Sequence, residues 1–229
     1  MKLTNIEKQF SILFFIIVLF ELLTSSTESL TNAHYIAKPA IVASLMVLFV
    51  KESISLDNQL KKLTLGALAF SLLGDVLLMF VDLSPHFFTV GLIAFLLAHF
   101  IYIIVFTKHR NRAIKPIGFI LLLLIYAAGL FYVLKSGLEE MLIPVMIYMI
   151  VILAMATSAF VRKGIVNKYS YNFVFIGAIF FMISDSILAL NKFYEAIPLA
   201  NILIMTTYAL AQYLIVIGIL KLSVTNSKE

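Results

Sequence analysis

The chain has 229 residues, of which 62% are hydrophobic and 13% are charged, and its formal net charge is +5. An ordinary soluble domain has about 25% charged and about 45–50% apolar residues, so this composition excludes a soluble globular protein, a disordered chain and a nucleic-acid-binding protein. The absence of cysteine excludes disulfides, thiolate metal ligands and cysteine nucleophiles.

Eight stretches are long and apolar enough to be membrane-spanning helices, each of which needs about 20 mainly apolar residues. Backbone groups in lipid must be hydrogen-bonded within their own segment, so we expect an all-α polytopic helix bundle. No part of the sequence between the spans is long enough for a soluble domain, and residues 1–229 are predicted to form a single transmembrane domain. The predicted spans are residues 9–24, 37–50, 63–81, 87–107, 116–135, 141–161, 172–191 and 198–221.

The positions of the basic residues predict the orientation of the bundle. Of the 17 Lys and Arg residues, all but Lys38, Lys135 and Lys192 fall on the side of the predicted membrane that holds the N-terminus. Loops rich in Lys and Arg stay in the cytoplasm. We therefore predict that the N- and C-termini are both cytoplasmic.

The sequence also contains a weak internal repeat. A shift of 110 residues aligns Phe70 to Asp75 with Phe180 to Asp185, and Leu78 with Leu188. An offset of four helices preserves chain direction, so the repeat would be a parallel 4+4 arrangement.

Two aspartates lie inside predicted spans, where charged side chains are costly and are usually functional. Asp75 and Asp185 are each seven residues before a residue at the outer end, Asp82 and Lys192, which places both carboxyls about 10 Å below the outer surface. We expect them to face one cavity, where burial and mutual repulsion would leave one protonated and the other ionised. The alternative is that each aspartate only clasps a neighbouring helix.

Further polar residues fall on the faces of two other spans. His99 and Tyr102 are one turn apart in the fourth span, and Tyr208 and Gln212 share one face of the eighth with Asn201. We expect these residues to line a deeper part of the same cavity, with His99 as a proton carrier or hydrogen-bond donor. The alternative is a buried neutral His99 satisfied by a bond between helices.

Several polar residues at or near span ends are additional candidates. Lys38, next to Pro39 in the predicted first turn of the second span, would contact a phosphate, pair with Glu21 or extend to the interface. Asn191 is the last residue of the seventh span, and it too would either contact the substrate or only lie at the interface. Ser184 and Ser71 are expected to be local hydrogen-bond partners of the neighbouring aspartates.

The motifs of the chain together resemble the YhhN family, which includes the vertebrate transmembrane lysoplasmalogenases. The resemblance runs from about residue 35 to about residue 217. The motifs that carry it are Lys38-Pro39, Gly74-Asp75, Ala98-His99 with Tyr102, Ser184-Asp185, and Tyr208 with Ala211-Gln212.

The resemblance implies an eight-span ether hydrolase that cleaves the vinyl ether bond of lysoplasmalogens. The products would be a fatty aldehyde and a glycerophospho-ethanolamine or -choline. Asp75 and Asp185 would be the catalytic carboxyls, by analogy with the acid and carboxylate pair of glycosidases. The substrate would be bound by Lys38, His99, Tyr102, Ser184, Asn191, Tyr208 and Gln212, with no metal and no other cofactor.

The expected partners are a lysophospholipid substrate and the lipid bilayer, with no nucleic acid and no protein partner. The compartment would be the cytoplasmic membrane in a bacterium or the endoplasmic reticulum in a eukaryote. Buried Asp and His residues also form proton relays, so a small proton-coupled transporter is the alternative function. A receptor or scaffold with a structural polar core is a third.

Overall fold

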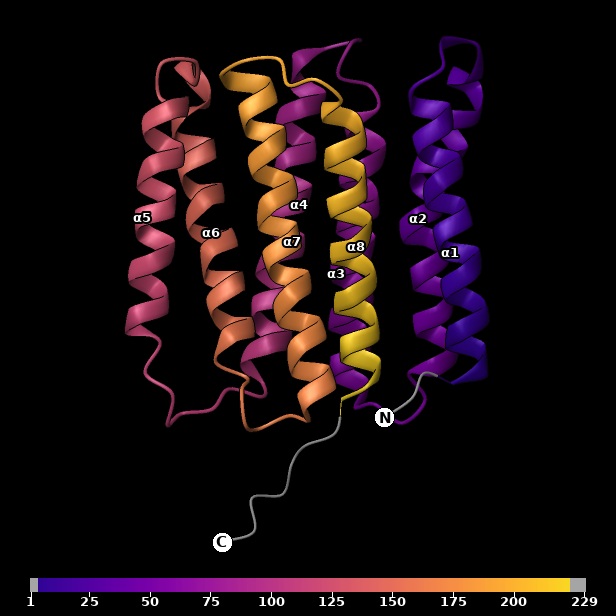
Figure 1. Cartoon of the computed structure of the whole chain (residues 1–229), viewed down its shortest axis with the longest axis vertical. Helices are drawn as coiled ribbons and strands as arrows, with labels where there is room; N and C mark the ends of the chain where they lie inside the picture. Colours follow the sequence, from indigo (N-terminus) through magenta and orange to yellow (C-terminus); the bar gives the residue numbers. More distant parts are fainter. Residues whose placement is uncertain (1–3, 223–229) are drawn as a thin grey trace, which may run out of the picture. The chain divides into compact units, whose positions relative to one another are not determined.

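The computed structural model describes residues 4–222, and this range is helical (Figure 1). The prediction of eight helices is confirmed, since each predicted span falls on one α-helix of the described range. Two 3₁₀ helices, η1 (Glu28–Leu30) and η2 (Glu139–Met141), precede α2 and α6. The α-helices are α1 (Asn5–Ser25), α2 (Thr31–Glu52), α3 (Asn58–Leu78), α4 (Pro85–Thr107), α5 (Ile117–Leu134), α6 (Leu142–Phe160), α7 (Lys168–Phe193) and α8 (Ala200–Leu220).

Six helices of the described range are long and apolar enough to cross a membrane: α2, α4, α5, α6, α7 and α8. The protein is therefore a multi-pass membrane protein. Membrane crossing by α1 and α3 stays a prediction, as do the cytoplasmic termini and the parallel repeat.

Several helices extend beyond the predicted spans or end before them, and two of these differences have a local physical reason. The second helix begins at Thr31 rather than at residue 37, so Pro39 lies inside α2 and not in its first turn. Membrane helices tolerate such a proline because neighbouring groups can satisfy the freed carbonyl. The third helix ends at Leu78 rather than at residue 81, because the chain tightens into a turn in which Phe80 N–H donates to the Leu77 carbonyl at 3.1 Å.

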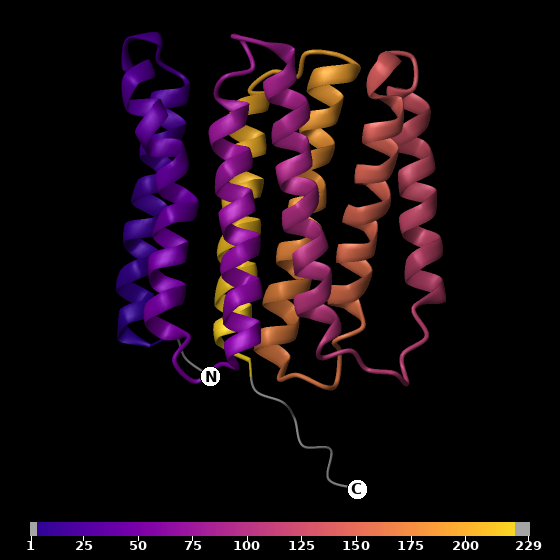
Figure 2. The same cartoon turned by 180° about the vertical axis from the view of Figure 1, so that it is seen from behind.

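One compact unit comprises the described chain from residue 4 to Ile101. In this unit α1 packs on α2 and α2 packs on α3, and Figure 2 shows the indigo α1 alongside α2. The first part of α4 lies close to α3, since a Cβ added to Gly74 would lie 2.6 Å from the Phe95 ring. Glycine at position 74 is what permits this contact next to Asp75.

The second compact unit begins at Tyr102. Its most extensive contact joins α7 to α8; α6 packs on α7, and α5 contacts α6 and α7 (Figure 1). Two glycines allow α7 and α8 to approach closely. A Cβ on Gly177 would lie 2.9 Å from the Ala211 carbonyl oxygen, and one on Gly218 would lie 2.9 Å from the Val174 nitrogen. Small residues at helix crossings are a common basis of packing in membranes.

By contrast, α5 is at the edge of this unit. Of its 18 residues, only Leu123 and Leu134 are buried. Phe119 of α5 stacks on Phe160 of α6 with ring centroids 4.4 Å apart, which ties one end of α5 to the unit. Much of the remaining surface of α5 is available to contact lipid.

Candidate functional site

Asp185 of α7 is held by a tyrosine of α6. The Tyr148 hydroxyl donates to Asp185 Oδ2 at 2.5 Å, with Tyr148 buried and Asp185 half-buried. The packing of α6 on α7 brings the two side chains together across a sequence separation of 37 residues. Tyr148 was not among the site residues predicted from the sequence. Its only sequence signal is that a tyrosine interrupts an otherwise apolar part of the sixth span.

A second polar chain links α4 and α8. The Tyr102 hydroxyl donates to Gln212 Oε1 at 2.9 Å, and Gln212 Nε2 donates to the Tyr208 hydroxyl at 3.3 Å. All three side chains are buried. The structure thus brings Tyr208 and Gln212 together with Tyr102, whereas Asn201 is exposed. The predicted cavity shared with His99 and the aspartates stays a prediction.

The two polar clusters are neighbours in the second unit. Tyr208, the last member of the Tyr102–Gln212–Tyr208 chain, lies near Tyr148, which bonds Asp185. The Tyr208 ring packs edge-on against Phe181 of α7, with ring centroids 5.4 Å apart. One carboxyl group, three phenols and an amide therefore occupy one region between α6, α7, α8 and the end of α4.

The serines do not bond the aspartates as expected. Ser184 Oγ donates to the Ile204 carbonyl of α8 at 3.0 Å, so it ties α7 to α8 rather than bonding Asp185. Ser71 Oγ, one turn before Asp75, is buried and has no hydrogen-bond partner among the described residues. Short hydroxyl side chains in a helix often reach backbone carbonyls before they reach another side chain.

Asp75 and His99 lie in the first unit. Asp75 is buried near the end of α3 beside the tight contact of Gly74 with Phe95, and His99 is fully buried in α4. Asp75 and Asp185 belong to different compact units. Their shared cavity stays a prediction from the sequence.

Glu21 pairs with a histidine and not with Lys38. Glu21 is fully buried at the end of α1, and His34 Nδ1 of α2 lies 3.1 Å from its carboxylate. Lys38, one turn after His34, is half-buried and acts electrostatically on both residues. No ion pair between Lys38 and Glu21 is present in the described part of the chain, so that alternative was wrong, and Lys38 remains available to an anion.

Asn191 has a role in the loop between α7 and α8. Its Oδ1 accepts a hydrogen bond from the Ile197 N–H at 2.9 Å. This bond fixes the start of the loop that leads to Pro198 and Leu199, where the backbone is left-handed (φ 59°) before α8 begins. The Oδ1 atom of Asn191 is thus already engaged in a hydrogen bond within the protein.

The loop between α6 and α7 contains a buried arginine. Arg162 is 2% exposed, donates from Nη2 to Ser170 Oγ at 3.1 Å and lies over the Phe106 ring. Burial lowers the pKa of Arg162 to about 10. Burial, together with the charges of Arg162 and Lys108, also holds the pKa of His109 below its usual range. His109 is therefore neutral near neutral pH.

No group of three or more His, Asp or Glu side chains in residues 4–222 lies close enough to hold a metal ion. The groups that the structure brings together are side chains: a carboxyl group with a phenol donor lies next to a buried chain of phenols and an amide. Such groups can orient water, stabilise a cation and exchange a proton.

The sequence has clear relatives. The sequence profile of the YhhN family matches residues 33–219. The human protein named lysoplasmalogenase TMEM86B is 34% identical over 158 residues, which is 68% of this chain and 62% of that protein. Human lysoplasmalogenase TMEM86A is 32% identical over 167 residues, or 71% of this chain and 65% of that protein.

A bacterial relative, named lysoplasmalogenase in Mycobacterium tuberculosis, is 27% identical over 193 residues, which is 82% of this chain and 72% of that protein. The present chain spans less than two thirds of the length of the two human relatives. No solved structure matches the chain.

Proposed function

Because this chain belongs to the YhhN family, we propose that it is a membrane hydrolase that cleaves the vinyl ether bond of lysoplasmalogens. The products are a fatty aldehyde and a glycerophospho-ethanolamine or -choline. The relatives named lysoplasmalogenase support this reaction. The structural observation that carries the proposal is the Tyr148–Asp185 hydrogen bond beside the buried Tyr102–Gln212–Tyr208 chain.

The reaction needs a proton donor, a water molecule and a group that stabilises positive charge. A carboxylic acid protonates the β-carbon of the vinyl ether, which gives an oxocarbenium ion. Water adds to this cation and loses a proton, and the resulting hemiacetal breaks its bond to the glycerol oxygen, which takes up a proton. Overall, one vinyl ether and one water give one aldehyde and one alcohol.

We assign the ionised role to Asp185. The Tyr148 hydroxyl donates to Oδ2 of Asp185 at 2.5 Å; the carbonyl oxygen of a neutral acid can also accept such a bond, but the bond is stronger to an ionised carboxylate. Such a charge-assisted bond holds the carboxylate in one orientation and supports its negative charge. The carboxylate then stabilises the oxocarbenium ion and orients water, as in glycoside hydrolysis.

The two-carboxyl mechanism expected from the sequence leaves proton delivery to Asp75, which is buried in α3. The substrate phosphate is assigned to Lys38, which is half-buried in α2 and makes no ion pair with Glu21. Water and the glycerol oxygens are assigned to His99, Tyr102, Ser184, Asn191, Tyr208 and Gln212. The alkyl chain would lie among apolar helix faces, and we propose that it enters from the membrane.

The test uses purified full-length protein in detergent with a 1-alkenyl lysophosphatidylethanolamine. Fatty aldehyde should be released, whereas the 1-alkyl and 1-acyl analogues, which lack the vinyl ether, should release none. In D₂O, with the aldehyde trapped at once by reduction, one deuterium should be found on the former β-carbon. Absence of aldehyde from an active, folded preparation would contradict the proposal, and an enzyme, unlike a transporter, needs no sealed membrane for this signal.

A further inference from the structure

The second unit contains a cavity at its basic end that the proposed reaction does not use. The cavity has a volume of about 460 Å³ and lies between the end of α4, α5 and α6. Leu123 and Val161 form buried parts of its wall, while Leu124 and Ile150 are 53% and 64% exposed. It is therefore a surface cavity, and over most of its length the surface of a membrane helix faces hydrocarbon.

The cavity has almost no free polar group. Thr107, Thr157 and Ser158 line it, but each hydroxyl donates to a carbonyl of its own helix: to Ile103, Leu153 and Met155 at 2.7–2.8 Å. Arg110 also lines the cavity, is exposed and has no carboxylate partner among residues 4–222. An occupant would thus meet an apolar channel with one cation at its end.

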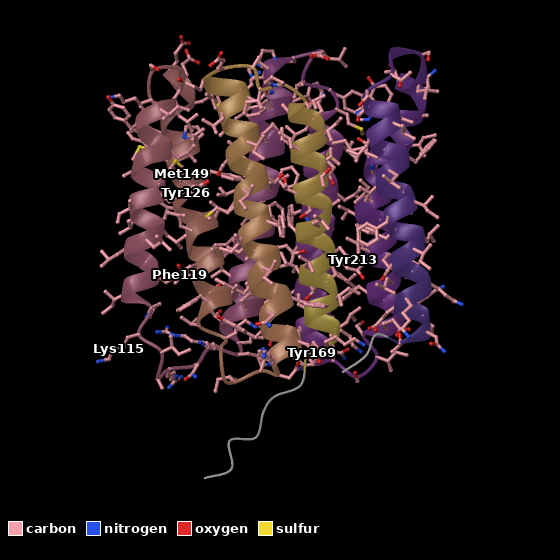
Figure 3. All side chains as sticks on the ribbon, viewed as in Figure 1. Lys115, Phe119, Tyr126, Met149, Tyr169 and Tyr213 are labelled. Atoms are coloured by element: carbon pink, nitrogen blue, oxygen red, sulfur yellow. The ribbon has the colours of Figure 1, made fainter. Side chains whose placement is uncertain are left out.

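The charge around Arg110 is strongly one-sided. Residues 108–116 and 161–168 contain seven Lys or Arg residues and no Asp or Glu. Figure 3 shows Lys115 beyond the end of α5, with Phe119 further along the helix. His109 adds no charge near neutral pH, because its pKa lies below the usual range. Basic pockets between membrane helices suit anionic lipid headgroups.

The dimensions fit one leaflet of a bilayer. From Val161 to Ile150 the cavity follows 11 residues of α6, or about 16 Å at 1.5 Å per residue. Half of the hydrocarbon core is about 15 Å thick. An acyl chain that filled the cavity would therefore place its headgroup at the depth of Arg110.

We propose that this cavity is a binding site for an anionic phospholipid, with an acyl chain between α4, α5 and α6 and the phosphate at Arg110. The site is separate from the proposed reaction centre. Ile150 is two residues, about 200° around α6, from Tyr148, so the cavity and Asp185 face different sides of that helix. Asp185 is also 17 residues, or about 26 Å, along α7 from Lys168 at the basic end.

The test measures binding of the first lipid to the purified full-length protein by native mass spectrometry. Dioleoyl phosphatidylglycerol and dioleoyl phosphatidylcholine have the same chains and differ in charge. The wild type should bind phosphatidylglycerol at least about tenfold more tightly, which corresponds to about 1.4 kcal/mol. Because the cavity needs a chain as well as a phosphate, sn-glycerol 3-phosphate should not compete at concentrations comparable to the lipid.

Three variants separate the site from general surface charge. Arg110→Gln should abolish the preference for phosphatidylglycerol. Arg112→Gln removes a nearby exposed cation that does not line the cavity and should preserve the preference within about twofold. Ala154→Phe, at an exposed lining residue, should fill the cavity and weaken binding of both lipids.

Each variant is first compared with the wild type for melting temperature and gel-filtration profile. Equal affinity of the wild type for the two lipids would overturn the proposal. So would equal losses in Arg110→Gln and Arg112→Gln, or competition by sn-glycerol 3-phosphate, which would indicate surface charge or a free phosphate. Unchanged binding by a folded Ala154→Phe variant would place the lipid elsewhere.

Discussion

Tyr148 and Asp185 form a 2.5 Å hydrogen bond that joins α6 to α7, with the phenol as donor. The neighbouring position on α7 has a parallel contact, because Ser186 Oγ lies 2.5 Å from the Tyr126 hydroxyl of α5. Two tyrosines from different helices thus contact α7 one residue apart. Only one of them contacts the carboxylate, so the pair offers a matched comparison.

Tyr148→Phe should lower kcat by about 10- to 10²-fold while KM changes little, since a hydrogen bond to a charged group contributes about 1.5–3 kcal/mol. The expected loss arises because Asp185 is no longer held in one orientation. Rates are measured as aldehyde release, and Tyr126→Phe is the control, for which kcat should stay within about twofold. Similar losses in both variants would indicate a general packing defect.

Asp75→Asn and Asp185→Asn should each lower kcat by at least about 10²-fold, the usual scale of general acid–base catalysis. Asn keeps the size of Asp but can neither deliver an acidic proton nor carry a negative charge. The double variant should be little worse than the worse single one, because residues that act as a unit are not additive. Melting temperatures establish that the variants are folded. Near-normal aldehyde release from both single variants would contradict the two-carboxyl mechanism and would mean that each aspartate only bonds a neighbouring helix.

Lys38→Ala should raise KM while kcat is nearly kept, because a phosphate contact stabilises the ground state and the transition state alike. Lys135→Ala is the comparison, since Lys135 Nζ lies over the Tyr132 ring, 4.6 Å from its centroid, and is assigned no phosphate. Unchanged kinetics in Lys38→Ala would mean that this lysine only reaches the interface. A lower kcat at constant KM would move Lys38 into the chemical step.

Gly177→Ala should destabilise the protein by about 1–3 kcal/mol, the usual cost of overpacking. The new methyl group would lie 2.8 Å from Ile215 Cγ1 and 2.9 Å from a backbone oxygen, so α7 and α8 must separate. The melting temperature in detergent measures the effect. Gly129→Ala in α5 is the control, because nothing lies within 4 Å of the added Cβ, and its melting temperature should not fall.

The helices were predictable because the thickness of hydrocarbon imposes a length and an apolar composition on every span. One part of the Tyr102–Gln212–Tyr208 chain was predictable. Tyr208 and Gln212 are four residues apart, about one turn, and therefore lie on one face of α8. Spacing on one helix does not specify which other helix lies opposite. The structure supplies that information.

Tyr148 shows where sequence reasoning ends. A single tyrosine in an apolar helix has no periodic pattern, and its importance comes from a partner 37 residues away. Ser184 and His34 are similar cases, since each bonds a group on another helix that no local motif indicates. Pro39 was placed in a first turn because proline favours that position, but the residues from Thr31 onward continue the helix in front of it.

The bond from Tyr102 to Gln212 has a consequence for biogenesis. It joins positions 110 residues apart, and at about 5–20 residues per second the ribosome needs roughly 5–20 s to make the intervening chain. During that interval α5, α6 and α7 are inserted, and the Tyr102 hydroxyl cannot yet bond Gln212. Assembly of the polar interior is therefore a late event that depends on α8, and an interruption of synthesis before α8 would leave a product with its helices inserted and its polar interior unfinished.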